Sequence, residues 1–255
     1  MNDEALLLRH DQDGVVTLTL NRPNQFNALS TELLAALQAE LDKLGADEAA
    51  RVVVIAGAGK AFCAGHDLKQ MRANHDKAYM QKLFKQCGRV MTSIVELPQP
   101  VIARVHGVAT AAGCQLVASC DLAIAADVAK FAVSGINVGL FCSTPAVALS
   151  RNVGRKQALE MLLTGEFIDA LEAQRRGLVN RVAPADALDA EVQRLAASIV
   201  AKSRTAIAMG KQLFYRQLEM GLAGAYQLAG ETMACNMMTD DAVAGIDGFM
   251  HKKKG

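Results

Sequence analysis

The stretch VIARVHGVATAAGCQLVASCDLAIAA, residues 101–126, contains the pattern that decides the fold. Residues 101–107 are rich in apolar β-branched side chains, which predicts a buried strand of the kind found in parallel sheets. A turn of small residues leads into AGCQLVASC, residues 112–120, which has the composition of a buried helix. Residues 121–126 then predict another strand. This immediate succession of strand, helix and strand is typical of a layered α/β protein.

The same alternation occurs on the N-terminal side of this stretch. Residues 15–21 have the pattern of a strand and follow Asp13-Gly14, a hairpin-type turn. Ser30 is suited to cap a helix, and residues 51–57 repeat the buried parallel-strand pattern. The helix after Ser30 would bury one apolar stripe, formed by Leu33, Leu34, Leu37, Leu41 and Leu44. We therefore expect an α/β domain.

Helical patterns dominate from residue 145 onward, apart from one short strand expected in LVNRVAP. We expect a core over residues 1–190 and a C-terminal helical region over residues 191–255. No low-complexity linker or repeat marks this boundary, so the two parts could also form one domain.

Bulk composition limits the classes of function. The 255 residues carry a net charge of +1, which gives no electrostatic reason to expect a nucleic-acid partner. No apolar stretch reaches the about 18 residues that a membrane span needs, and MNDEALLLRH does not resemble a signal peptide. The six scattered cysteines suit free thiols in a reducing compartment. We therefore expect a cytoplasmic protein without a membrane span.

Several common catalytic motifs are missing. The sequence has no HExxH motif and no paired His/Cys cluster, so we expect no metal site. It has no GxSxG elbow, which gives no support to serine hydrolase chemistry. The glycines at 57–59 lack the third glycine of a dinucleotide fingerprint.

Two turns of small residues deserve comparison, AFCAG at 61–65 and ATAAG at 109–113. Each follows a predicted buried strand, and small side chains let backbone N–H groups approach a ligand closely. A pair of free N–H donors near a helix start is what an oxyanion hole needs. The alternative is that these turns only pack tightly.

Taken in order, four stretches resemble the crotonase superfamily, also known as the enoyl-CoA hydratase/isomerase superfamily. They are LNRPNQFNALS, AFCAGHDLK, PVIARVHGVATAAGCQLVASCDLAIA and LTGEFIDALEAQRRGLVNRV. The sequences TAAGCQLVASCD and NVGLFCSTP are most similar to one branch of that superfamily. The resemblance covers nearly the whole chain. It implies a spiral of ββα units with a C-terminal helical region that forms a trimer, or a dimer of trimers.

The resemblance also implies a site for acyl-CoA thioesters. Two backbone N–H groups would polarise the thioester carbonyl and stabilise an enolate, and the matching positions are Ala64 and Ala112. CoA itself would serve as part of the substrate, with no further cofactor and no metal. The matching CoA-binding positions are Phe26, Ala64, Gly65, His66, Asp67, Leu68, Ala112, Phe249 and Lys252.

The chain departs from the family at both acids that hydratases use to add water. The first glutamate is replaced by Gln115 and the second by Gly135. Neither residue transfers protons near neutral pH, and general acid–base help is worth about 10²–10⁴-fold in rate. Gln115 also places an amide in a buried helix, where an unpaired polar group costs about 1–3 kcal/mol, so we expect it to have a hydrogen-bond partner.

Two hypotheses about function follow. In the first, the protein is an enzyme with altered chemistry, such as decarboxylation, thioester hydrolysis or weak hydration. His66 and Cys142 are then candidates to replace the missing acids, because one titrates near neutral pH and the other is a potential nucleophile. In the second hypothesis, the protein is a non-catalytic acyl-CoA binder or a structural partner of active relatives.

Overall fold

The structure is a computed structural model that describes residues 5–252. It begins with a hairpin of β1 (Leu7–Gln12) and β2 (Val15–Leu20), paired antiparallel. Asp13 and Gly14 join the strands with φ angles of 50° and 78°. Positive φ at both central residues matches the twist of a hairpin, which explains the Asp-Gly pair. The predicted turn and the predicted second strand are confirmed.

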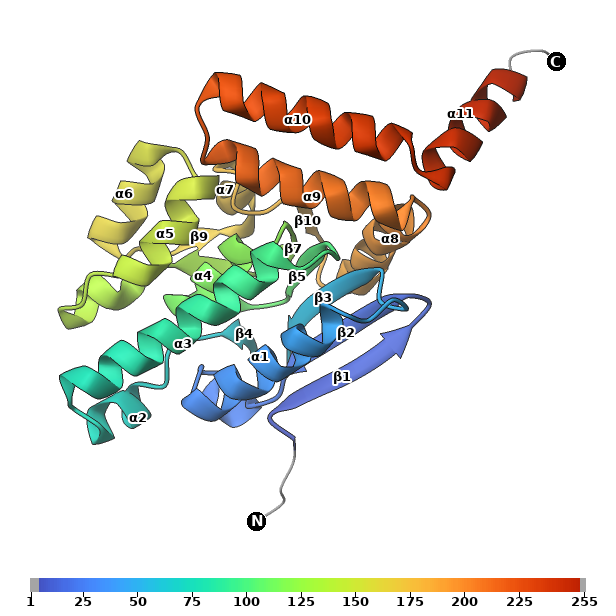
Figure 1. Cartoon of the computed structure of the whole chain (residues 1–255). Helices are drawn as coiled ribbons and strands as arrows, with labels where there is room; N and C mark the ends of the chain where they lie inside the picture. Colours follow the sequence, from blue (N-terminus) through green and yellow to red (C-terminus); the bar gives the residue numbers. More distant parts are fainter. Residues whose placement is uncertain (1–4, 253–255) are drawn as a thin grey trace.

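The chain then repeats a unit of two strands followed by a helix (Figure 1). In the second to fourth units, the first strand joins a six-stranded sheet of order β1-β2-β3-β5-β7-β10. The second strand of each unit joins a four-stranded sheet of order β4-β6-β8-β9. The elements of these units are β3 (Val52–Gly57), β4 (Ala61–Cys63), α2 (Leu68–Ala73), α3 (Lys77–Glu96), β5 (Val101–Val105), β6 (Val108–Thr110), α4 (Ala112–Ser119), β7 (Leu122–Ala126) and β8 (Lys130–Ala132). The predicted spiral of ββα units is confirmed.

The second strands of the units were not predicted as strands. β4, β6 and β8 have three residues each, too few to show an alternation of apolar and polar side chains. The remaining elements are η1 (Pro23–Gln25), α1 (Thr31–Leu44), η2 (Ser134–Val138), α5 (Ser143–Asn152), α6 (Arg155–Thr164), β9 (Ile168–Asp169), α7 (Ala170–Arg175), β10 (Arg181–Ala183), α8 (Leu188–Val200), α9 (Arg204–Leu218), α10 (Leu222–Met237) and α11 (Asp240–Lys252).

Helices cover both faces of the six-stranded sheet. On one face, α1 buries its five predicted leucines, and Ser30 caps the helix by accepting from the Leu33 N–H at 3.2 Å. On the other face, α8 buries Leu188, Val192 and Ala196 against β3, β5 and β7. The expected boundary between residues 190 and 191 falls inside α8, and the part of α8 beyond it still packs on the sheet.

A buried ion pair attaches α9 to the core. Lys211 Nζ lies 2.7 Å from Asp121 Oδ2, and the Tyr215 hydroxyl donates to Asp121 Oδ1 at 2.8 Å. Asp121 also accepts from the Val101 N–H at 2.6 Å. Burial lowers the pKa of Lys211, while the neighbouring Asp121 carboxylate opposes that shift. One carboxylate therefore links the end of α4, the start of β5 and α9.

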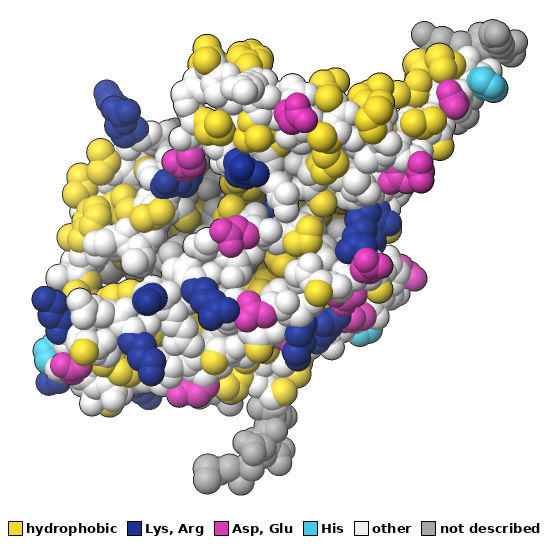
Figure 2. Space-filling model, viewed as in Figure 1, with side chains coloured by type: hydrophobic (Ala, Val, Ile, Leu, Met, Phe, Trp, Pro, Cys, Tyr) yellow, Lys and Arg dark blue, Asp and Glu magenta, His cyan; other side chains and the backbone are white. Residues whose placement is uncertain are grey.

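The last two helices present apolar side chains to the outside. α10 packs against α9, and α11 projects away from the body of the molecule (Figure 1). Figure 2 shows hydrophobic side chains gathered over both helices. The exposed members are Leu222, Tyr226, Met233, Met237, Met238, Val243, Ile246, Phe249 and Met250. Within residues 5–252, no helix combines the length and apolar character needed to cross a membrane.

Candidate functional site

The two small-residue turns lie against each other in the structure. We call residues 61–66 the first turn and residues 109–113 the second turn. A Cβ atom at Gly113 would lie 2.1 Å from the Cys63 carbonyl oxygen, so only glycine fits there. Gly65 has a φ of +93°, and a Cβ atom on it would lie 3.3 Å from the Ala112 nitrogen. Glycines therefore let the backbones of the two turns meet.

In the first turn, the His66 N–H has no partner among the described residues, whereas the Ala64 N–H has one. The Ala64 N–H donates to the Phe26 carbonyl at 3.0 Å. On either side of His66, the Leu29 N–H donates to the Gly65 carbonyl and the Asp67 N–H donates to the Leu29 carbonyl. In residues 5–252, nothing accepts a hydrogen bond from the His66 N–H. The sequence match had pointed to Ala64 as the free donor.

The second turn places the Ala112 N–H at the start of α4. Ala111 precedes the helix with a φ of 50° and donates its own N–H to the Ala132 carbonyl at 2.9 Å. The first N–H groups of a helix have no partner inside it. No acceptor for the Ala112 N–H occurs in the part of the chain that the structure describes. Ala112 thus meets the geometric requirement for a free donor.

The loop at 22–29 fixes the first turn through Asn27, a residue that sequence reasoning missed. Asn27 is fully buried and has a φ of 55°. Its Nδ2 donates to the carbonyls of Ala58 and Ala61, each at 2.8 Å, and lies 3.2 Å from the Phe62 carbonyl. Asn tolerates the left-handed backbone region and can form hydrogen bonds with nearby backbone groups. An asparagine between Phe26 and Ala28 was therefore the sequence feature that could have predicted this role.

Asp67 serves the architecture of this loop. Its carboxylate accepts from the N–H groups of Lys69 and Gln70, each at 3.1 Å, and so caps α2. It also lies 2.9 Å from the Arg22 guanidinium. Burial opposes ionisation of Asp67, but the hydrogen bonds from Arg22 and the backbone outweigh it and lower the pKa. We therefore assign Asp67 to positioning the first turn.

Gln115 is buried in α4 with 5% of its surface exposed. Its Oε1 atom has no hydrogen-bond partner among the described residues, in contrast to the partner expected from the sequence. Buried polar atoms are rarely left unpaired, and each exception requires an explanation. Gln115 therefore offers an acceptor to a group that the described residues do not supply.

The two candidates for replacing the acids are both held in uncharged forms. Both ring nitrogens of His66 are buried without a described partner, and its ring contacts Phe84 edge-on at 5.5 Å. Burial lowers the pKa of His66, so the imidazole is neutral at pH 7. Burial raises the pKa of the Cys142 thiol, which disfavours the nucleophilic thiolate. His66 is therefore not prepared to act as a proton donor, and Cys142 is not prepared to act as a nucleophile.

The other predicted CoA-binding residues form two groups that lie apart from each other. Phe26 and Leu68 are exposed beside the first turn, at 54% and 58% of their surfaces. Phe249 is exposed on α11, and Lys252 is the last residue of that helix. Since α11 projects away from β4 and α4 (Figure 1), a single chain does not bring these two residues to the turns.

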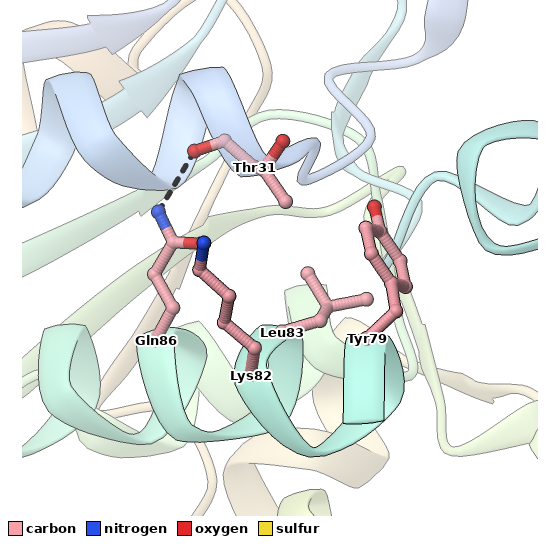
Figure 3. Close-up of a pocket in the computed structure, with 5 residues that line it drawn as sticks. All are labelled: Thr31, Tyr79, Lys82, Leu83 and Gln86. Atoms are coloured by element: carbon pink, nitrogen blue, oxygen red, sulfur yellow. Dashed lines mark hydrogen bonds between the residues drawn. The ribbon is translucent and has the colours of Figure 1, made fainter. Parts of the chain in front are cut away.

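Two hollows open on the surface formed by α1, α2 and α3. One, of about 350 Å³, lies between α1 and α3 and is lined by Thr31, Tyr79, Lys82, Leu83 and Gln86 (Figure 3). There the Gln86 side chain donates to the Thr31 carbonyl at 2.8 Å. The second hollow lies on α2 and includes Leu68. No group of three potential metal-ligating side chains occurs within residues 5–252.

Comparison with known proteins identifies the family. Residues 10–255 match the family model described as enoyl-CoA hydratase/isomerase. The chain belongs to the enoyl-CoA hydratase/isomerase family. A crystal structure of an enoyl-CoA hydratase from Mycobacterium smegmatis superposes with a TM-score of 0.97 at 62% identity, covering 98% of this chain and 97% of the other.

The similarity extends to one branch of this family. The mouse protein named enoyl-CoA hydratase domain-containing protein 3, mitochondrial, is 45% identical over 99% of this chain and 84% of its own length. The crystal structure of human enoyl-CoA hydratase domain-containing protein 3 matches with a TM-score of 0.95 and 43% identity, covering 97% of this chain and 98% of the other. The expected similarity to one branch is confirmed.

The expectation of a cytoplasmic protein is wrong. The mouse relative and its counterparts from rat and human are named as mitochondrial. The sequence argument rested on free cysteines and on the N-terminal residues. Free thiols indicate a reducing compartment but do not distinguish one such compartment from another.

Proposed function

We propose that the protein binds acyl-CoA thioesters and polarises their carbonyl with the N–H groups of His66 and Ala112. The observation that carries this proposal is that these two donors are unpartnered and lie on turns in direct contact. Preorganised donors aimed at a developing oxyanion are worth about 3–4 kcal/mol each in the transition state. Relative to the sequence match, His66 takes the place of Ala64 as the first donor.

The chemistry at this site would differ from that of a standard hydratase. Efficient water addition relies on two acids, and Gln115 and Gly135 provide none. Reactions that need only an enolate-stabilising site, such as decarboxylation, remain compatible with two N–H donors. Thioester hydrolysis and weak hydration are the alternative reactions within this proposal. No metal or separate cofactor is needed for these reactions.

A second candidate function is acyl-CoA binding without catalysis. It is favoured by the state of the two candidate replacements: His66 is not held as a proton donor, and the Cys142 thiol is not held as a nucleophilic thiolate. The donors would then hold a thioester without converting it. A single ester turned over above background would exclude this function.

Assembly into a trimer or a dimer of trimers would complete the CoA site. The apolar faces of α10 and α11 are exposed in the single chain, and large exposed apolar surfaces mark sites of association. In such an assembly, Phe249 and Lys252 of one subunit would contact CoA held by the next. Sedimentation analysis of the purified protein tests this part of the proposal.

The decisive experiment incubates the protein with a panel of acyl-CoA esters and follows the products by mass spectrometry. Binding is measured in parallel with a cinnamoyl-CoA ester, whose absorption moves to longer wavelength when its carbonyl is polarised. We expect a red shift on binding, and crotonyl-CoA hydration at least 100-fold slower than by a two-glutamate relative. Absence of a red shift would contradict the donor assignment. Hydration at the relative's rate would contradict altered chemistry.

A further inference from the structure

Position 135, where a hydratase carries its second acid, lies in a turn that closes back on itself. Gly135 belongs to η2, and its carbonyl accepts from the Leu140 N–H at 2.9 Å. The Gly135 N–H lies 3.3 Å from Cys142 Sγ, to which it donates. Ser134 Oγ lies 2.8 Å from Thr110 Oγ1, which ties this turn to the strand before Ala112. Residues 140–142 therefore cover Gly135 from outside.

This closure leaves no room for a side chain at position 135. A Cβ atom there would lie 2.6 Å from the Leu140 carbonyl oxygen and 2.7 Å from Cys142 Sγ. Both distances are shorter than real Cβ atoms show. Gly135 is not among the glycines with positive φ, so space rather than backbone conformation excludes other residues. Replacing the residue alone would not restore the lost acid.

The two obstacles differ in whether a substitution can remove them. Leu140 contributes a backbone carbonyl, which stays whatever side chain the residue carries. Cys142 is buried, with 8% of its surface exposed, and directly precedes α5, which packs on α4. Protein interiors are densely packed, so the thiol has little room to move aside. Cys142 thus contributes the obstacle that a substitution to alanine removes.

We propose, on the basis of the function proposed above, that Cys142 is a specificity-determining residue of the candidate site. Its thiol occupies the volume that a side chain from position 135 would need. A neutral, weakly polar group thereby stands where a hydratase has a carboxylate. The site therefore suits acyl-CoA esters whose reaction requires no acid at position 135. Gly135 and Cys142 act as a matched pair, because the thiol fills the space that the glycine leaves.

The packing part is tested without any ligand, by the melting temperatures of a double-mutant cycle. Gly135→Ala should lower the melting temperature, and Cys142→Ala combined with it should recover at least half of the loss. Gly139→Ala serves as the matched control, because its Cβ would meet no atom and its cost comes from a φ of +79°. Cys142→Ala should not relieve that cost. Additive losses for Gly135→Ala and Cys142→Ala would overturn the proposal.

The specificity part is tested by crotonyl-CoA hydration in two engineered proteins. Gln115→Glu/Gly135→Glu supplies both acids but keeps the thiol, whereas the triple variant adds Cys142→Ala. We expect the triple variant to hydrate at least tenfold faster, with Gln115→Glu/Cys142→Ala no faster than Gln115→Glu. Equal rates for the double and triple variants would overturn the proposal. Should the triple variant not fold, the melting cycle decides.

These experiments separate the inference from the proposed function. If the wild-type protein binds no CoA ester, the proposed function fails, while the melting cycle still reports whether Cys142 limits position 135. If the protein binds CoA esters but the cycle is additive, only the role of Cys142 fails.

Discussion

The two sides of the candidate site differ in how they depend on individual side chains. On the donor side, His66 and Ala112 contribute backbone N–H groups, which any residue other than proline carries. On the acid side, a hydratase needs carboxylates, and one substitution at each of two positions has removed them. A backbone function is protected by the fold, whereas a side-chain function is lost with a single residue. The four predictions below test this contrast.

The largest effect is expected from breaking the donor side at Gly113. Gly113→Val places atoms against the Cys63 carbonyl, where even a Cβ would lie at 2.1 Å. We expect a loss of at least about 4 kcal/mol in the free energy of unfolding, measured by denaturant titration. Gly88→Ala in α3 is the control, because its Cβ would meet no atom, and it should stabilise the helix by about 0.5–1 kcal/mol. A tolerated valine would show that the turns need not touch.

A smaller effect is expected from removing the support of the first turn. Asn27→Ala leaves the buried carbonyls of Ala61 and Phe62 without their side-chain donor. Unpaired buried groups cost about 1–3 kcal/mol each, so we expect about 2–4 kcal/mol of destabilisation in chemical unfolding. The cinnamoyl-CoA red shift should also shrink. Asn24→Ala, at an exposed neighbouring position, should change neither quantity. An unchanged red shift would separate Asn27 from the donor geometry.

Gln115 tests the contrast further, because its amide should contribute to ligand affinity rather than to the stability of the fold. Gln115→Met removes an unpartnered carbonyl at similar volume, so stability should stay within about 1 kcal/mol or rise. Affinity for an acyl-CoA, measured calorimetrically, should fall about tenfold, equal to about 1.4 kcal/mol.

Gln99→Met is the comparison for this prediction. Gln99 is also buried with an unpartnered Oε1, but its Nε2 donates to the Leu44 carbonyl at 2.8 Å. Its replacement should therefore destabilise the protein. A Gln115→Met protein that is equally destabilised would give Gln115 a structural role.

The smallest effect concerns pH and the His66 ring. Burial lowers the pKa of His66 in the folded protein, below the value of about 6.5 for an unfolded chain. Between these values the unfolded state binds more protons, so stability falls as the pH drops through that window. His66→Gln should make the dependence of the melting temperature on pH shallower. His75→Gln, at an exposed position, should leave the slope unchanged. An identical slope in both variants would contradict the assignment.

The sequence was most informative where signals were long or local. The apolar stripe of α1, the Ser30 cap and the Asp13-Gly14 turn were all readable, because each depends on residues near in the chain. The short strands β4 and β6 were not, since three residues give no measurable period. At the site, the two turns were found from their small residues. The free donor within the first turn was not, because the partner of Ala64 lies in another segment.

From the order of its residues alone, this chain revealed an α/β domain and a family resemblance, which implied the spiral and the loss of both acids at Gln115 and Gly135. Those features depend on residue types and on patterns among residues that are near in the chain. Only the tertiary structure decided that the His66 N–H is unpartnered while the Ala64 N–H is not, and that Cys142 fills the space beside Gly135. Hydrogen-bond partners and free volume depend on segments far apart in the chain, and folding alone brings those segments together.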